Sequence, residues 1–178
     1  MKRSHTDVLF ALLDYERKTS KFFKEFFTEL NFDFGCGWAR ADLVIIEEGR
    51  SVAGRRGKTV SLYEVKTEET GLSKTIFDSC KQVSLYQLGI SKPLLFIRDK
   101  IKAEILNGSL AFSVELVIPE KLLEEVRYYP QDYFEKLKVF LQFHRAGILA
   151  YTPQMNFYQP KGFPLPITVL IEELKGGR

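Results

Sequence analysis

The sequence predicts an α/β domain in which a mixed β-sheet is flanked by helices and followed by a C-terminal α+β elaboration. Apolar residues between positions 6 and 30 recur at helical spacing, and a second helical pattern runs from Ser73 to Gly89. Between them, residues 41–48 and 61–67 have the length and the Val, Ile, Leu and Tyr content of strands. Alternation of helical and strand patterns along one chain is typical of α/β proteins.

The length and composition indicate a single domain, residues 1–178. A chain of 178 residues can bury a substantial core. We expect the main part of this domain at about residues 6–99 and a C-terminal elaboration of it at about residues 100–178. The composition, 45% hydrophobic and 28% charged, is ordinary for a globular protein, and the net charge of +3 permits contact with a polyanion without establishing it.

Two cysteines, Cys36 and Cys80, are too few for a disulfide framework or a four-cysteine metal cluster, so both are interpreted as buried thiols. The charged N-terminus lacks the apolar segment of a signal peptide. No apolar run approaches the roughly 18 residues that a membrane-spanning helix needs. We therefore expect a cytoplasmic protein with no membrane partner.

The N-terminal pattern is compatible with one helix over residues 6–30 or with two helices separated near Thr19. In a continuous helix, Glu16 falls near the centre of the apolar face. A carboxylate in that position is either functional or paired. After a helix break, Glu16 forms a salt bridge with Arg17 or Lys18, and the sequence does not decide between these alternatives.

A first strand is expected within residues 31–40, and the two apolar runs that follow it form a β-hairpin. If the hairpin is centred near Gly54, Asp42 lies opposite Lys66, and Glu64 lies diagonally across from Asp42. Glu64 and Lys66 share one face of their strand because side chains alternate. Two carboxylates and an ammonium group are thus expected to meet at one place in the sheet.

Two adjacent buried carboxylates need more positive charge than one lysine supplies. A hard divalent cation such as Mg²⁺ or Mn²⁺ meets that need, since it prefers carboxylate, water and phosphate oxygens. Such an ion makes a bound water nucleophilic, and a neighbouring lysine can orient that water or stabilise charge that develops on phosphorus. Asp42, Glu64 and Lys66 therefore suit the hydrolysis of phosphodiester bonds.

Asp42 at the head of one strand and Glu64-Val65-Lys66 in the next resemble the signature of the PD-(D/E)xK nuclease superfamily. The segment from Gln82 to Tyr86 is similar to the Gln-x-x-x-Tyr motif of its RecB-like branch. The chain lacks the four cysteines that hold an iron–sulfur cluster in CRISPR-associated members of that branch. The resemblance spans residues 42–86 and implies a restriction-endonuclease-like fold with metal-dependent deoxyribonuclease activity.

The resemblance also implies roles for individual residues. Asp42 and Glu64 are expected to hold Mg²⁺ or Mn²⁺, with the carbonyl of Val65 as a further ligand. Lys66 is expected to position the attacking water.

Further candidates lie on or just before the two predicted helices. Many members of the superfamily carry an acidic metal ligand on the first helix, and Glu16 is the candidate for it. His5 is similar in placement to the upstream histidine of some RecB-like nucleases, but we interpret it as solvated. Gln82 and Tyr86, four residues apart and so on one helix face, are expected to orient the substrate.

Four basic residues are candidate contacts for a substrate phosphate: Arg40, Arg55, Arg56 and Lys58. Arg40 precedes Asp42 on the same strand face. The other three lie in the segment 49–58, the most basic of the chain, whose three glycines suggest a flexible hairpin loop. The alternative for Arg40 is a surface arginine without a role in binding, and the alternative for the segment 49–58 is a solvated hairpin loop. If the two strands are long, this loop points away from the metal.

Residues after position 92 predict further elements but less about function. A buried strand is expected at residues 93–97, and Asn107-Gly108 predicts a hairpin between residues 102–106 and 110–118. Helices are expected at residues 119–129 and 131–144, and short strands at 147–152 and 167–172. Several aromatic side chains can stack on bases, although packing is the preferred explanation for most of them: Tyr128, Tyr129, Tyr133, Phe157 and Tyr158.

The expected function is divalent-metal-dependent hydrolysis of DNA, exonuclease-like as in the RecB-like branch. A structure-selective endonuclease of the Holliday-junction resolvase or restriction type is the alternative among enzymes. Dimerisation would favour this alternative, and the sequence does not decide whether the protein forms a homodimer. A non-catalytic nucleic-acid-binding or assembly subunit is the alternative outside enzymes.

Overall fold

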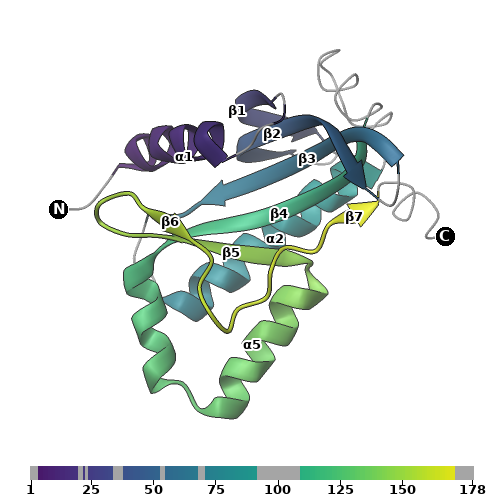
Figure 1. The fold of residues 1–178 in the computed structure, drawn as a ribbon. Helices are drawn as coiled ribbons and strands as arrows, with labels where there is room; N and C mark the ends of the chain where they lie inside the picture. Colours follow the sequence, from purple (N-terminus) through teal and green to yellow (C-terminus); the bar gives the residue numbers. More distant parts are fainter. Residues whose placement is uncertain are drawn as a thin grey trace.

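The computed structural model describes residues 4–19, 22, 24–33, 38–52, 55–67, 71–91 and 109–170. Within these residues the strands form one sheet of seven, in the order β1-β2-β3-β4-β5-β6, with β7 beside β4. Helix α1 packs on one face of the sheet and helices α2 and α5 pack on the other (Figure 1). The predicted α/β class, a mixed sheet flanked by helices, is confirmed.

The chain begins with helix α1 (His5–Thr19). The N–H of Asp7 donates to Ser4 Oγ at 3.1 Å and the N–H of Ser4 donates to Asp7 Oδ2 at 3.2 Å, a reciprocal cap of the first turn. Its apolar residues Val8, Leu9, Leu12 and Leu13 are buried against the sheet. The helix ends at Thr19, as the two-helix alternative required.

Strand β1 (Lys24–Asp33) occupies the segment for which the sequence predicted a second helix, so that part of the prediction was wrong. Phe27 and Leu30 contact the same core although they are three residues apart. Glu29 between them has a φ of 54°, which interrupts the strand's alternation. Two core residues of this strand are therefore three positions apart, a spacing that is normally typical of a helix.

Strands β2 (Trp38–Val52) and β3 (Arg55–Val65) form the predicted hairpin, but both are longer than expected. A bulge near Glu48 accommodates the glycine-rich segment, so most of the predicted loop is paired strand. Leu43 pairs with Tyr63, which brings Asp42 level with Glu64 rather than Lys66. The predicted register was two residues out, an error that leaves each side chain on its predicted face.

Strand β4 (Ser109–Pro119) runs parallel to β3, and β5 (Ala146–Tyr151) runs parallel to β4. The short strands β6 (Phe157–Tyr158) and β7 (Val169–Leu170) add antiparallel pairs to β5 and β4. Every residue of β5 is buried, as expected for a parallel strand covered on both faces. The region after residue 100 therefore completes the central sheet. The predicted strand 93–97 and hairpin arm 102–106 lie outside the described residues.

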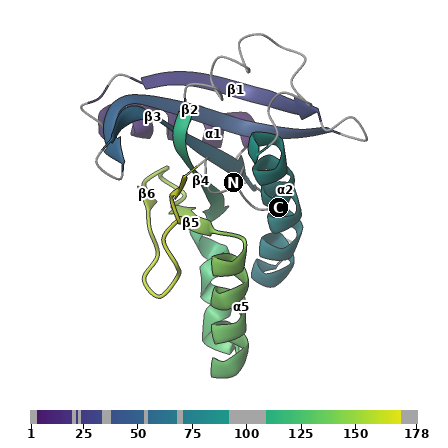
Figure 2. The same cartoon turned by 90° about the vertical axis from the view of Figure 1, so that its right-hand side faces the viewer.

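Helix α2 (Leu72–Ser91), the 3₁₀ helix η1 (Glu120–Tyr128) and helix α5 (Gln131–Phe143) pack on the face opposite α1. Figure 2 shows α2 and α5 on the same side of the sheet. Helix α2 begins one residue before the predicted cap Ser73, and the N–H of Leu72 donates to Glu125 Oε2 of η1 at 2.8 Å. The C-terminal region thus anchors the start of α2.

The predicted aromatic residues follow the packing explanation in part. Tyr129 and Tyr133 stack edge to face and bond the hydroxyl of Ser73, and Phe157 is buried. Tyr128 is exposed.

Cys80 is a buried free thiol whose pKa burial raises to about 12, and Cys36 lies outside the described residues. Among the helices of the described ranges, none has the length and apolarity to cross a bilayer.

Candidate active site

Asp42 lies on β2 at the point where its pairing with β3 ends. The last backbone pair is Leu43 with Tyr63, and beyond it the N–H of Val65 donates to the Asp42 carboxylate, at 2.7 Å from Oδ2. The next N–H, of Lys66, donates to the carbonyl of Val117 on β4 at 2.8 Å. The end of β3 is therefore hydrogen-bonded to the Asp42 side chain on one side and to β4 on the other. The bond from the Val65 N–H also orients the Asp42 carboxylate.

Glu64 points from β3 towards α2 and is only 3% exposed. Lys66 Nζ donates to its Oε1 at 2.6 Å, and the Tyr86 hydroxyl contacts its Oε2 at 2.5 Å. The same hydroxyl lies 2.7 Å from the carbonyl oxygen of Arg40, so Tyr86 ties β2 to β3 from α2. Both oxygens of the carboxylate are thus oriented by protein groups.

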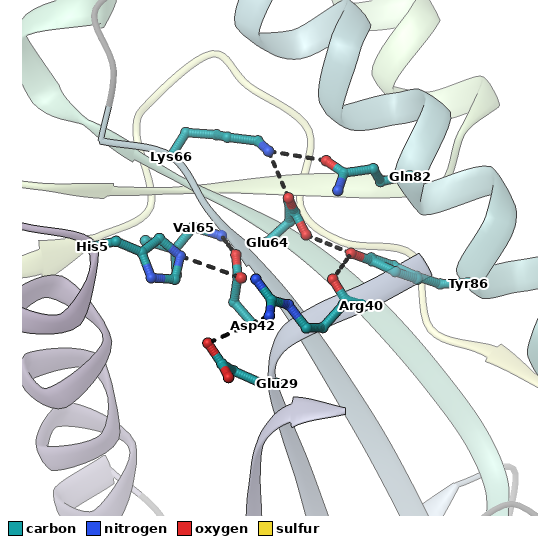
Figure 3. A network of polar contacts seen from close by, with 9 residues as sticks. All are labelled: His5, Glu29, Arg40, Asp42, Glu64, Val65, Lys66, Gln82 and Tyr86. Atoms are coloured by element: carbon teal, nitrogen blue, oxygen red, sulfur yellow. Dashed lines mark hydrogen bonds and ion pairs between the residues drawn. The ribbon is translucent and has the colours of Figure 1, made fainter. Parts of the chain in front are cut away.

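Lys66 stands at the boundary between this buried cluster and solvent, with 29% of its side chain exposed. Its Nζ also donates to Gln82 Oε1 at 2.9 Å. Its backbone carbonyl accepts from the Tyr151 hydroxyl of β5 at 3.2 Å. Gln82 and Tyr86 lie one turn apart on α2. Gln82 therefore bonds the lysine of the Glu-x-Lys motif and Tyr86 bonds its glutamate (Figure 3).

Burial raises the pKa of the Glu64 carboxyl, and the charge of Asp42 raises it further. The ion pair with Lys66 and the hydrogen bonds from Lys66 and Tyr86 act in the opposite direction. Burial also raises the pKa of the Tyr86 phenol, so this residue stays a neutral donor. Two interacting carboxylates beside one ammonium group leave an excess negative charge, which favours a bound cation or proton.

A cleft of about 430 Å³ opens at this cluster. It is lined by His5, Ala39, Arg40, Asp42, Glu64, Val65, Lys66, Gln82 and Leu85. The structure thus brings together six of the predicted site residues, with Tyr86 directly behind them. Arg40 also lines the cleft, and its guanidinium lies 3.8 Å from Glu29 Oε1.

His5 belongs to this site although the sequence interpretation left it solvated. It is the first residue of α1, and its Nε2 lies 3.2 Å from Asp42 Oδ1. The docking of α1 with its N-terminal end at the cleft produces this contact. The only signal in the sequence was the likeness to an upstream histidine, because nothing local to His5 shows where a helix docks.

The donor set fits a hard divalent cation. Asp42 and Glu64 supply carboxylate oxygens, each with lone pairs left after its hydrogen bonds, and their mutual repulsion favours a cation between them. Within the described ranges, no group of three or more His, Cys, Asp or Glu side chains is arranged to hold a metal. Mg²⁺ or Mn²⁺ held here would take its remaining ligands from water, a backbone carbonyl and the substrate.

Glu16 does not lie with these residues. It sits eleven residues beyond His5 on α1, about 16 Å along the helix axis. Its carboxylate accepts from Lys24 Nζ at 2.7 Å and from the Tyr63 hydroxyl at 2.9 Å. The expected third acidic ligand is corrected accordingly: Glu16 is paired, though with Lys24 of β1 rather than with Arg17 or Lys18.

Arg55, Arg56 and Lys58 lie at the far end of the hairpin. Lys58 is six residues from Glu64 along β3, about 20 Å, and the two arginines are farther along the strand. Lys58 Nζ pairs with Glu48 Oε1 at 2.8 Å. Since the strands are long, these three residues are remote from the cleft, which is the alternative that the sequence left open.

Comparisons of this chain with protein-family models, curated proteins and solved structures find no match. The resemblance to PD-(D/E)xK nucleases stays a hypothesis carried by the motif residues.

Proposed function

We propose that this protein is a divalent-metal-dependent nuclease that hydrolyses phosphodiester bonds of DNA. The observation that carries the proposal is the contact between Lys66 Nζ and the buried carboxylate of Glu64, with Asp42 beside it at the floor of an open cleft. Two carboxylates for a cation and a lysine for a water or phosphate oxygen are the groups that this reaction needs.

Asp42 and Glu64 would hold Mg²⁺ or Mn²⁺, with His5 and the Val65 carbonyl next to them. The bound ion would lower the pKa of a water and offset the charge of the substrate phosphate. Lys66 then orients the water from the cleft side, since its ammonium group keeps one donor after bonding Glu64 and Gln82. Arg40 lines the same cleft and would contact the phosphate.

Gln82 and Tyr86 act as positioning residues. Gln82 fixes Lys66 and Tyr86 fixes Glu64, so α2 sets the distance between the lysine and the carboxylates. The preference for an exonuclease over an endonuclease comes from the resemblance of the Gln82 to Tyr86 segment to the RecB-like branch, and the geometry of the site is the same for both.

The proposal is tested with labelled linear single- and double-stranded DNA and with closed circles, in Mg²⁺, Mn²⁺ or EDTA. We expect degradation of linear DNA that EDTA abolishes and that Lys66→Ala lowers roughly 100-fold or more. Lys18→Ala, which removes an exposed lysine paired with Asp14, is the control. Equal activity in Lys66→Ala would disprove the site. Cleavage of circles would identify an endonuclease, and a folded wild type that binds DNA without cutting it would indicate the non-catalytic alternative.

A further inference from the structure

The cleft continues past Lys66 into a second cavity of about 420 Å³. The two cavities share His5, Val65 and Lys66. Each is of a size that accommodates a small ligand such as one nucleotide. Lys66 therefore stands at a junction, with room for substrate on both sides of the proposed reaction centre.

The two sides differ in chemistry. The first cavity has Ala39, Leu85 and Gln82 beyond the charged cluster, a partly apolar lining. The second cavity is lined beyond the shared residues by Thr67, Lys74, Thr75 and Asp78. The hydroxyl group of Thr67 and the ammonium group of Lys74 suit a phosphate.

Lys74 and Asp78 lie one turn apart on α2, with Lys74 Nζ 2.7 Å from Asp78 Oδ2. The other oxygen of Asp78 lies 3.3 Å from Lys81 Nζ, so one carboxylate is shared by two lysines. The three residues carry a net positive charge. The Lys74 side chain is 65% exposed, which leaves it accessible to a ligand that enters the cavity.

We propose that the second cavity is a subsite for the phosphate adjacent to the scissile one in a single strand of DNA, with Lys74 as its cationic contact. The inference rests on the proposed function, since it takes Lys66 as the reaction centre. Asp78 pairs with Lys74 at the cavity and is one group with which the phosphate competes. A good substrate accordingly has a phosphate on each side of Lys66, and a mononucleotide bound with its phosphate at the reaction centre does not reach Lys74.

The test measures binding of a fluorescently labelled short oligothymidylate by anisotropy over a series of salt concentrations. Ca²⁺ replaces Mg²⁺, and gels verify that the probe stays intact. For a single strand, each phosphate contact contributes about 0.7 to the slope of log affinity against log salt concentration. We expect Lys74→Ala to weaken binding and to reduce that slope by about 0.7. Asp78→Asn should act in the opposite direction, because it removes a competing negative charge.

Helix α5 offers a matched control. Lys136 and Asp132 form the same kind of exposed pair, one turn apart at 3.3 Å, with Lys136 76% exposed and outside both cavities. Lys136→Ala and Asp132→Asn should leave the affinity and the slope unchanged. Thymidine 5′-monophosphate, used as an unlabelled competitor, should bind equally to wild type and Lys74→Ala.

Equal slopes for Lys74→Ala and Lys136→Ala would overturn the subsite, and so would an equal loss of mononucleotide binding in Lys74→Ala. If the wild type cuts DNA while Lys74→Ala behaves as wild type, the subsite fails and the proposed function stands. If the slope changes as expected but no DNA is cut, the proposed function fails and the strand-binding subsite stands. A wild type that neither binds nor cuts DNA would overturn both.

Discussion

The two faces of the sheet carry clusters built from the same kinds of residue, two carboxylates, a lysine and a tyrosine. The α2-side cluster consists of Asp42, Glu64, Lys66 and Tyr86, and the α1-side cluster consists of Glu16, Lys24, Tyr63 and Glu115. Adjacent residues of β3 contribute to both, since Tyr63 faces α1 and Glu64 faces α2. Their chemistry nevertheless differs.

In the α1-side cluster the lysine is locked. Lys24 is 8% exposed and bonds both the carboxylate and the backbone carbonyl of Glu16, while Tyr63 bonds the other carboxylate oxygen. Glu115 is left beside this neutral pair. Burial and the charge of Glu16 raise the pKa of Glu115 to about 7, so a proton relieves its charge.

In the α2-side cluster the lysine lies at the mouth of a cleft and the carboxylates lie beneath it. A hollow of about 680 Å³ also adjoins the α1-side cluster, so cavity size does not separate the two. The separating feature is that Lys66 keeps exposed surface and a free donor position, whereas Lys24 is enclosed. Both clusters combine two carboxylates with one lysine, so composition alone does not define a catalytic cluster; the accessibility of the lysine distinguishes them.

The largest expected difference is in activity. Glu64→Gln should lower DNA hydrolysis roughly 100- to 1,000-fold, because it removes a carboxylate that holds the cation. Glu16→Gln, the same chemical change in the α1-side cluster, should leave the rate unchanged when both variants are assayed well below their melting temperatures. A comparable loss of rate in Glu16→Gln would remove the distinction between the clusters.

The next difference is in stability. Lys24→Met leaves the mostly buried carboxylate of Glu16 without its cation and should lower the free energy of unfolding by at most about 3 kcal/mol, measured by urea denaturation. Lys18→Met breaks an exposed pair with Asp14 and should cost less than about 1 kcal/mol. Similar midpoints for the two variants would show that Lys24 is not the structural partner of Glu16.

The smallest difference is in pH dependence. Because the folded pKa of Glu115, about 7, lies above the ordinary glutamate pKa of 4.5, its protonated form stabilises the fold. That stability is fully present below pH 4.5 and is lost as the pH rises through about 7, at most on the order of 3 kcal/mol. Glu115→Gln should remove this loss and be more stable than wild type above pH 7.

The control for this measurement is Glu124→Gln, which changes an exposed carboxylate on η1. It should keep the pH dependence of the wild type. Parallel stability curves for wild type and Glu115→Gln from acid to neutral pH would contradict the assignment. Lys24, Glu16 and Tyr63 line the same hollow as Glu115, so these three residues are kept unchanged in both variants.

The core of the candidate site was predictable because it depends on local periodicity. Alternation along β3 puts Glu64 and Lys66 on one face, and a spacing of four puts Gln82 and Tyr86 on one side of α2. These relations survive a register error of two residues, which is why Asp42 still meets Glu64 in the structure. The fold class was predictable for the same reason.

The sequence by itself determined which side chains could converge: a carboxylate pair with a lysine on strands, and an amide with a phenol on a helix. Tertiary structure alone decided that His5 joins them, that Glu16 is neutralised by Lys24, and that β4 and β5 fix the backbone of Lys66. It also decided that the basic end of the hairpin lies far from the cleft, because β3 extends from Arg55 to Val65. Periodicity orients a side chain relative to its own element, but the docking of one element on another depends on packing between residues far apart in the chain.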